Sequence, residues 1–470
     1  MKQRKKYIYS KKYKIFSINP AWRQIPDKDL ENTVNAEFKE LIGYNQNDPV
    51  EFVTNYDLDK IKANLANLNQ LLIEVTDGCN LQCKYCGYGD LYNNYDKRNT
   101  KQQQFLNVKL LIDHLASLWR SKYNTSYQKE IAVGFYGGEP LLNVPLIKET
   151  ITYLESLSDI PVHFSYNMTT NSILLDRYMD FLAEKKFKLL LSLDGDELGS
   201  SYRVDKQGKG SFKRVFANIK LLQDTYPEYF DKYVNFNAVL HDRNSVESTF
   251  MFIKSNFSKV PRIAELNTNG LSEKGEKELM QMFRDKFNSF NQASVEFKTQ
   301  EDIQMEHSQI MAYHSFVRNF SGNYYNNYFD LFDANECRLI PTGTCRPFER
   351  KIFLTVNGKI LPCEKIGQEH VLGKIDNNVL MLDYEQVEAY YKNAYEKVVR
   401  NCKTCLSKRS CGQCIFLLKE RNERENKEGK FICPSYMGEK VADAYFAQFL
   451  TYAEEHPDLY EEIMKNIATV

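Results

Sequence analysis

The sequence predicts an α/β fold in which a barrel-like domain is followed by a cysteine-rich domain. Between residues 71 and 267, six short β-rich apolar runs alternate with amphipathic stretches, and eight of the eleven cysteines lie beyond residue 336. Strands that alternate with helices are typical of βαβ units and a parallel sheet. Six such units over about 200 residues suit a barrel whose active site lies at the carboxyl ends of the strands.

The expected strands are short apolar runs, and amphipathic stretches such as VKLLIDHLASLWR (108–120) and FKRVFANIKLL (212–222) predict the helices between them. The six strands are LLIEVT (71–76), IAVGFYG (131–137), VHFSYNMTT (162–170), KLLLSLDG (188–195), VNFNAVL (234–240) and RIAELN (262–267).

Composition and charge exclude several classes of protein. The 62 basic residues balance the 62 acidic residues, so we expect neither nucleic acid nor a membrane surface as a partner. No apolar run approaches the roughly 20 residues of a membrane span. The basic, polar N-terminus lacks a signal peptide, so we expect the eleven cysteines to be reduced in the cytoplasm and to bind metal.

Three cysteines are packed into the run TDGCNLQCKYCGYGD (76–90), directly after the first expected strand. Three cysteines cannot all pair in disulfides, and disulfides between such near neighbours would constrain little of the chain, which argues against disulfides. Zinc would want four ligands, usually in separated pairs. A [4Fe-4S] cluster held by three thiolates keeps one iron open to a small molecule. The alternatives are three buried thiols or a fragment of a zinc site.

The pattern Cys79-x3-Cys83-x2-Cys86, with the aromatic Tyr85 before its last cysteine, resembles the signature of radical S-adenosylmethionine (SAM) enzymes. The resemblance implies a partial (β/α)6 barrel and a [4Fe-4S] cluster whose open iron chelates SAM. It also implies a reductant, such as flavodoxin or ferredoxin, that delivers the electron for cleaving SAM to a 5'-deoxyadenosyl radical.

Tyr85 and polar residues at later strand ends are the candidate SAM contacts. Gly137-Gly138-Glu139-Pro140 ends the second strand, and taken alone such a sequence is common at turns. By position it resembles the GGE motif that binds the amino group of SAM. The other candidates also lie at strand ends, where the alternative to a SAM contact is a purely structural role. Arg214 is an alternative to Arg203 as the residue that contacts the carboxylate of SAM. By resemblance the ribose and carboxylate of SAM are held by Thr169, Thr170, Asn171, Ser192, Asp194, Gly195 and Arg203.

The C-terminal cysteines follow a second pattern. Cys345 and Cys363 flank two strand-like runs joined at Asn357-Gly358, a favoured hairpin turn that would bring the two thiols toward one another. A zinc ribbon is the alternative, although the gap between the CxxC pairs is short for a zinc finger. The remaining cysteines are Cys337, Cys402, Cys405, Cys411, Cys414 and Cys433.

This second pattern resembles the SPASM domain, which carries two auxiliary [4Fe-4S] clusters, so three clusters would use all eleven cysteines. The family's last gap is three residues and here it is two, which leaves Cys411 and Cys414 interchangeable. Full ligation would make the auxiliary clusters electron carriers or structural elements, whereas an open iron would let one of them bind substrate. The resemblance assigns the first cluster to Cys337, Cys345, Cys363 and Cys414, and the second to Cys402, Cys405, Cys411 and Cys433.

Glu364 follows Cys363 in PCEKI and would lie beside the first auxiliary cluster. A carboxylate removed from bulk water could have a raised pKa and take a proton from substrate as a general base. The alternative is a surface glutamate paired with Lys365 or Arg346, which would contribute little.

The resemblance extends over residues 68–440, and SPASM proteins mostly modify ribosomally made peptides (RiPPs) or proteins. VTDGCNLQCKYCGYGDLY, FNAVLHDRNSVE and AELNTNG resemble peptide maturases of Bacteroidetes. We therefore expect an enzyme that abstracts hydrogen from a precursor peptide with a leader and installs a thioether or side-chain crosslink. The alternatives are a sulfatase-maturing enzyme that forms formylglycine, an iron-sulfur electron-transfer protein and a zinc-binding module.

Four regions are expected along the chain. They are an N-terminal segment (1–70), which is either a leader-binding region or a barrel cap, the barrel (71–325), the SPASM domain (326–440) and C-terminal helices (441–470).

Overall fold

The computed structural model describes residues 51–125, 129–157, 159–298, 312–316, 338–408, 411–418 and 433–438, with isolated positions up to 458. Residues 1–50 of the expected N-terminal segment, Cys337 and most of the expected C-terminal helices lie outside the described residues. Among the described residues, no helix combines the length and the apolar character needed to cross a membrane.

The chain forms two compact units that cut across the expected regions. The barrel unit comprises Tyr56–Ile303 and Cys345–Tyr390, and the second unit comprises Met1–Asn55, Gln304–Thr344 and Tyr391–Val470. The end of the expected N-terminal segment and the expected hairpin therefore belong to the barrel unit. The predicted domain boundaries themselves stay predictions.

The barrel unit is built on a ten-stranded sheet with the strand order β12-β11-β10-β9-β2-β3-β4-β5-β6-β7. The strands from β2 to β7 pair in parallel in the order of the chain, which confirms the α/β class. Their bounds are β2 (Gln70–Thr76), β3 (Lys129–Gly137), β4 (Val162–Thr170), β5 (Lys188–Ser192), β6 (Val234–Leu240) and β7 (Arg262–Glu265).

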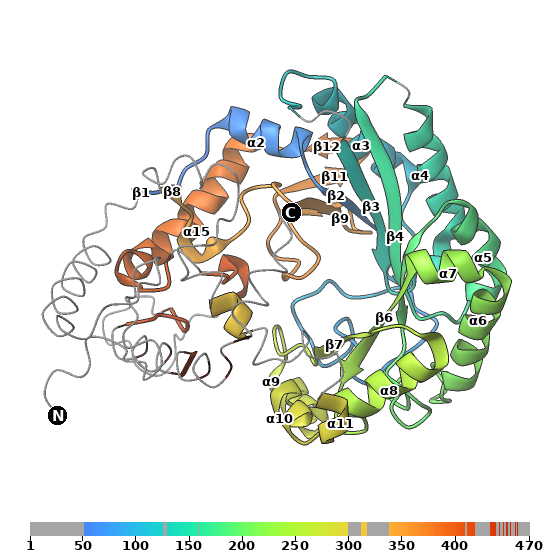
Figure 1. The fold of residues 1–470 in the computed structure, drawn as a ribbon. Helices are drawn as coiled ribbons and strands as arrows, with labels where there is room; N and C mark the ends of the chain where they lie inside the picture. The colour runs from blue at the N-terminus through green and yellow to red at the C-terminus, as the bar shows by residue number, and fades with distance from the viewer. Residues whose placement is uncertain are drawn as a thin grey trace, which may run out of the picture. The chain divides into compact units, whose positions relative to one another are not determined.

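Helices lie between these strands and cover one side of the sheet, as Figure 1 shows for α3 to α8. The apolar positions that recur along α3 are buried, among them Leu111, Ile112 and Leu115. The helices are α2 (Leu58–Ala66), α3 (Phe105–Trp119), α4 (Val144–Ser156), α5 (Leu175–Glu184), α6 (Phe212–Thr225), α7 (Pro227–Tyr233), α8 (Val246–Phe257), α9 (Glu273–Met282), α10 (Lys286–Asn291) and α11 (Val295–Lys298).

The expected hairpin forms, and its first strand extends the parallel sheet. β9 (Lys351–Leu354) pairs in parallel with β2 and antiparallel with β10 (Lys359–Leu361). β9 therefore covers the backbone groups that an edge at β2 would leave unpaired. The sheet continues through β11 (Gly373–Asp376) and β12 (Val379–Met381), after which α15 (Tyr384–Thr404) begins.

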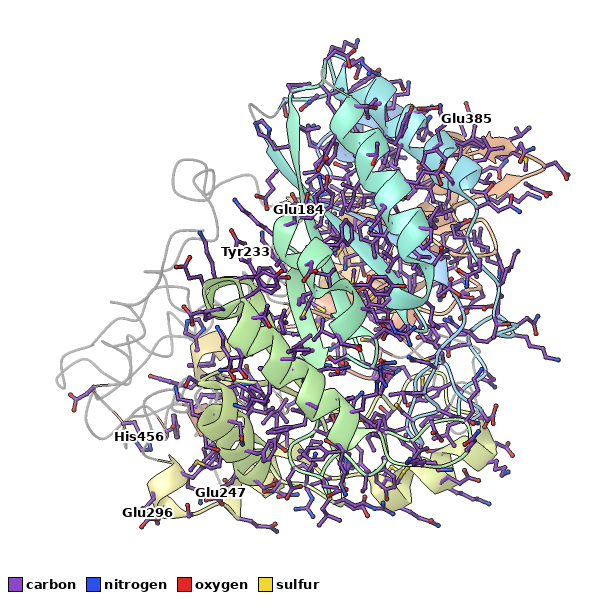
Figure 2. The ribbon with its side chains drawn as sticks, turned by 90° about the vertical axis from the view of Figure 1, so that its right-hand side faces the viewer. Glu184, Tyr233, Glu247, Glu296, Glu385 and His456 are labelled. Atoms are coloured by element: carbon purple, nitrogen blue, oxygen red, sulfur yellow. The ribbon has the colours of Figure 1, made fainter. Side chains whose placement is uncertain are left out.

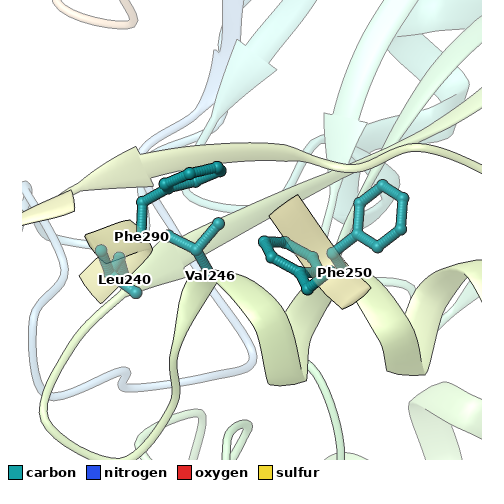
Figure 3. Close-up of a cluster of buried hydrophobic side chains, with 5 residues drawn as sticks. Leu240, Val246, Phe250 and Phe290 are labelled. Atoms are coloured by element: carbon teal, nitrogen blue, oxygen red, sulfur yellow. The ribbon is translucent and has the colours of Figure 1, made fainter. Parts of the chain in front are cut away.

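The opposite end of the sheet is closed by the segment after β7. Leu240, Val246, Phe250, Phe290 and Phe297 form a buried apolar cluster drawn from β6, α8, α10 and α11 (Figure 3). A polar contact supports it, because the backbone N–H of Ser294 donates to the carboxylate of Glu247, which Figure 2 labels on α8. The helices after β7 are thereby fixed against α8.

The described part of the second unit contains β1 (Glu51–Phe52), which pairs in parallel with β8 (Arg338–Leu339). It also holds the turns η3 (Pro341–Gly343) and η4 (Ile415–Leu417) and the part of α15 from Tyr391 onward. The hydroxyl of Thr344 accepts a hydrogen bond from the Ile415 backbone N–H at 2.8 Å, which joins the two turn regions.

Candidate functional site

The cysteine loop, residues 77–90, leaves the carboxyl end of β2, where the sequence predicts the active site. The backbone N–H groups of Gln82 and Lys84 donate to the carbonyls of Val204 and Tyr202 at 2.7 and 3.1 Å. These bonds anchor the loop on the segment that follows β5. The thiols of Cys79, Cys83 and Cys86 come within electrostatic reach of one another.

The donor set of the cysteine loop fits an iron-sulfur cluster. Burial raises the pKa of Cys79 to about 12 and that of Cys83 to about 11, whereas a bound metal deprotonates a coordinating thiol. No three His, Cys, Asp or Glu side chains among the described residues are arranged to hold a single metal ion. Three thiolates suit a [4Fe-4S] cluster with one open iron, because each thiolate binds a different iron of the cube.

The two glycines after β3 allow the cysteine loop to approach. Gly137 has φ +141°, and a Cβ there would overlap the carbonyl oxygen of Thr76; a Cβ on Gly138 would overlap that of Gly78. The backbone N–H of Glu139 then donates to the Gly78 carbonyl at 2.9 Å. The close backbone approach that the two glycines allow is thus made toward the segment leading into Cys79.

Glu139 joins the ends of β3 and β4. Its carboxylate is 1% exposed and accepts hydrogen bonds from the Leu141 N–H (3.1 Å), the Thr170 hydroxyl (2.7 Å) and the Asn171 N–H (2.8 Å). Burial raises the pKa of Glu139 to about 7. A carboxylate offers about four lone-pair sites, so three bonds leave room for one further donor. The predicted contact with an amino group fits that remaining site and stays a prediction.

Asn171 connects this acidic group to the cysteine loop. Its side-chain amide donates to the Asn80 side chain at 2.7 Å and lies 3.7 Å from the sulfur of Cys79. The side-chain nitrogen of Asn80 is buried and has no hydrogen-bond partner among the described residues. The Asn171 amide at the end of β4 and the Asn80 amide of the cysteine loop therefore both lie beside the first thiol.

A buried network centred on Asp194 lies on the other side of the cysteine loop. Arg203 donates to both carboxylate oxygens at 2.8 Å, the Val239 N–H donates at 2.8 Å, and the Tyr85 hydroxyl donates as well. Asp194 is 0% exposed, and these four donors use its accepting capacity. Burial alone would raise the pKa of Asp194, but the Arg203 guanidinium lowers it to about 2.

Two residues predicted to contact the cofactor, Tyr85 and Arg203, are thus brought together on one carboxylate. Cys83 lies within electrostatic reach of both Arg203 and Asp194, so the network borders the thiols. Sequence reasoning placed Asp194 among the polar strand ends but missed its central position. The available signal was an acidic residue that follows a buried strand end and precedes an arginine by nine positions.

The other candidates are dispersed. Ser192 is buried at the end of β5, and Thr169 is half-buried on β4. Gly195 follows with φ +109°. Arg214 lies on α6, where it donates to the Ile173 carbonyl at 3.1 Å and faces Asp176, so the structure does not bring it to the Asp194 network.

Glu364 forms an ion pair with Lys351 of β9. The ammonium lies 2.9 and 3.1 Å from the two carboxylate oxygens, which are largely buried. Burial raises the pKa of Glu364, but Lys351 outweighs it and the net shift is downward. The expected raised pKa and the expected partners Lys365 and Arg346 are wrong, because the hairpin brings residue 351 across to residue 364. The catalytic role of Glu364 stays a prediction.

Four cysteines gather in the second unit. Cys402 lies within electrostatic reach of the thiols of Cys405, Cys411 and Cys433. The Leu406 N–H donates to the Met437 carbonyl at 2.9 Å, which holds the Cys433 segment against the end of α15. This is the set predicted for the second auxiliary cluster. The thiols predicted for the first cluster are divided between the two units, with Cys345 and Cys363 in the barrel unit and Cys414 in the second, and their grouping stays a prediction.

Comparison with known proteins gives a family match over part of the chain. Residues 73–248 match the model of the radical SAM superfamily. A cysteine-type anaerobic sulfatase-maturating enzyme of Clostridium novyi is 30% identical over 168 residues, covering 35% of this chain and 43% of that protein. A radical SAM cyclopropyl synthase of Paramaledivibacter caminithermalis is 22% identical over 240 residues, 49% of each chain. The chain thus spans about half the length of the first curated relatives it matches.

Longer matches have lower identity. A cysteine-type anaerobic sulfatase-maturating enzyme of Clostridium perfringens (strain 13) is 24% identical over 401 residues, covering 78% of this chain and 94% of that protein. The solved structure of native anSMEcpe with bound AdoMet and the Kp18Cys peptide superimposes with a TM-score of 0.50 at 19% identity, covering 85% of this chain and 99% of that chain. At this identity the structural likeness supports the fold alone.

Proposed function

We propose that this chain, which contains a radical SAM domain over residues 73–248, is a peptide maturase that uses a 5'-deoxyadenosyl radical to modify a ribosomally made precursor peptide oxidatively. The observation that carries the proposal is the meeting of the three-thiol loop with the buried strand-end groups Glu139 and Asp194. A radical that abstracts hydrogen from a side chain can lead to a thioether or a side-chain crosslink. The partners would be a precursor peptide with its leader and a small electron donor.

Each part of the site has a separable task in this proposal. When bound at the three thiolates, a [4Fe-4S] cluster with an open iron supplies the electron that cleaves SAM. Glu139 offers its remaining lone pair to the amino group of SAM, and Arg203, held by Asp194, offers its free N–H groups to the carboxylate. Glu139 and Arg203 are both buried and already held by hydrogen bonds to the protein, so they need little reorganisation when SAM binds.

Glu364 would accept the proton that the substrate loses after hydrogen abstraction. The Lys351 ion pair keeps the carboxylate ionised and therefore able to accept. The Glu364→Gln variant is expected to retain 5'-deoxyadenosine formation and to lose product by about 10²-fold or more, the usual contribution of a general base. Both compounds are quantified by liquid chromatography and mass spectrometry. Glu349→Gln, in the same segment and half exposed, is the control; equal product from Glu364→Gln and wild type would show Glu364 to be a bystander.

The cluster count is a second prediction. Three cubes would give about twelve iron and twelve sulfide per reconstituted chain. Cys405→Ala, which removes one thiol of the group in the second unit, is expected to lower the iron content by about four. Colorimetric iron and sulfide assays on anaerobically purified protein measure both. A wild-type value near four would contradict the assignment of auxiliary clusters.

Sulfatase maturation is the second candidate, supported by the similarity to anaerobic sulfatase-maturating enzymes. The two candidates are separated by coexpressing this chain with short peptides encoded beside its gene and, in parallel, with a sulfatase. Mass spectrometry distinguishes loss of hydrogen on crosslinking from conversion of Cys or Ser to formylglycine. If the reduced, reconstituted protein forms no 5'-deoxyadenosine, both candidates fail and an electron-transfer role is favoured.

A further inference from the structure

The loop that follows the cysteine motif is fastened to the hairpin that carries Cys363. Asp96 lies ten residues after Cys86, and Lys359 lies four residues before Cys363. Their charged groups meet at 2.6 Å between Lys359 Nζ and Asp96 Oδ1, and the Asn357 side-chain amide donates to Asp96 Oδ2 at 3.0 Å. One carboxylate thus accepts from both the turn and the second strand of the hairpin.

Gln368 fastens the same two segments through the backbone. Its side-chain oxygen accepts from the Asp96 N–H at 2.9 Å, and its own N–H donates to the Asn94 carbonyl at 2.9 Å. The Lys359 ammonium also reaches the Gln368 carbonyl at 3.2 Å. Gln368 is 4% exposed, so these bonds are shielded from competition by water. The five residues Asn94, Asp96, Asn357, Lys359 and Gln368 are called the clamp below.

A second connection runs beside the clamp. Glu74, buried on β2, faces Arg98 at 2.8 Å and accepts from the Val356 N–H of the hairpin at 2.9 Å. The Arg98 guanidinium lies 3.6 Å from the centre of the Tyr88 ring. The loop is therefore held by the hairpin and by the strand from which the cysteine loop starts.

The clamped loop interacts with thiols of both cysteine segments in the barrel unit. The Tyr95 hydroxyl is within electrostatic reach of both the Cys86 and the Cys363 thiols. The Tyr136 hydroxyl is likewise within reach of Cys86 and Glu364. A shift of the hairpin against the loop would therefore change the distance between the radical-generating thiols and Cys363.

We propose that Asp96, Lys359 and Gln368 are positioning residues that fix Cys363 and Glu364 relative to the radical-generating cysteine loop. The functional consequence rests on the proposed function, in which a substrate radical formed at the cysteine loop would lose a proton to Glu364 and an electron to an iron-sulfur cluster that Cys363 would help to hold. Breaking the clamp would leave SAM cleavage intact and reduce the fraction of radicals that end in product. The clamp itself is a property of the fold and does not depend on the peptide.

The exchange of backbone amide hydrogen tests the clamp without any peptide. In the Asp96→Asn variant of the full chain, amides within 94–98 and 366–372 are expected to exchange about tenfold faster, the effect of losing one charge-assisted hydrogen bond. The charge swap Asp96→Lys with Lys359→Asp is expected to restore most of the protection. Asp159→Asn, which breaks the exposed pair with Arg120 in the same unit, is the control and should leave these segments unchanged.

The ratio of 5'-deoxyadenosine to modified peptide tests the positioning role. The peptide is the one modified on coexpression with the wild type, and the ratio is expected to rise at least about threefold in Asp96→Asn and to return in the charge swap. If Asp96→Asn only reduced the amount of folded protein, 5'-deoxyadenosine and modified peptide would fall together and their ratio would stay unchanged. Unaltered exchange in Asp96→Asn overturns the clamp, and faster exchange with an unaltered ratio overturns the positioning role. If the wild type forms no 5'-deoxyadenosine, the proposed function fails, while the exchange measurement still decides on the clamp.

Discussion

Replacing Cys83 with alanine is expected to abolish reductive cleavage of SAM. Cys83 lies at the centre of the three-thiol loop, within electrostatic reach of Cys86 and of the Asp194 network. With two thiolates the loop cannot hold a cube that keeps only one iron open. The measurement is 5'-deoxyadenosine formed by the reconstituted, dithionite-reduced protein, and we expect a fall to the level of the no-enzyme background.

Cys345→Ala is the matched comparison for Cys83→Ala. Cys345 is an exposed thiol outside the cysteine loop, predicted to serve the first auxiliary cluster. This variant should retain part of the SAM cleavage and lose product, since the three thiols of the cysteine loop are unchanged. Formation of 5'-deoxyadenosine by Cys83→Ala would show that the cysteine loop is not the radical-generating site.

The strands of the barrel unit were predictable because the apolar pattern of each strand is contained in a few consecutive residues. Each expected strand is an apolar run bounded by turn residues, and each reappears with ends shifted by at most a few residues. The largest shift is in the run 188–195, which ends as a strand at Ser192. The chain leaves the sheet there, and the carboxylate of Asp194 accepts from Arg203 and from the Val239 N–H.

The parallel pairing of β9 with β2 was not predictable in the same way. The hairpin turn at Asn357-Gly358 is a local signal, but β9 and β2 are separated by more than 270 residues. No local pattern states which sheet edge a hairpin will cover. Burial of Ile352, Phe353 and Leu354 shows in retrospect that β9 is an interior strand.

The ion-pair partners of charged residues were equally unpredictable from the sequence. The alternative reading of Glu364 paired it with Lys365 or Arg346, but its partner Lys351 lies across the hairpin. Asp96 and Lys359 are separated by 263 positions, and neither residue is unusual in its local context. The spacing of cysteines predicts a metal or cluster site, because the same spacings recur in known ligand sets. A single aspartate or lysine predicts no partner from the sequence, because the fold decides which charged residue lies beside it.

Replacing Asp194 with alanine is expected to be among the most destabilising single changes in the barrel unit. Arg203 is 7% exposed and donates two hydrogen bonds to Asp194, so the variant leaves a guanidinium buried without its counter-ion. Removing one partner of such a pair costs about 3–5 kcal/mol. The Tyr85 hydroxyl and the Val239 N–H lose their acceptor as well. The measurement is the free energy of unfolding in urea, followed by a tryptophan fluorescence transition.

Two further variants separate charge from shape at Asp194. Asp194→Asn keeps an acceptor of the same size but leaves the Arg203 charge unpaired, so it should retain most of the loss, because the cost arises from an uncompensated charge and not from a cavity. Asp159→Ala, which breaks the exposed pair with Arg120, should cost at most about 1 kcal/mol. A loss below about 1 kcal/mol in Asp194→Ala would mean that Arg203 finds another partner or reaches water. In that case Asp194 would not be the group that holds Arg203 beside the cysteine loop.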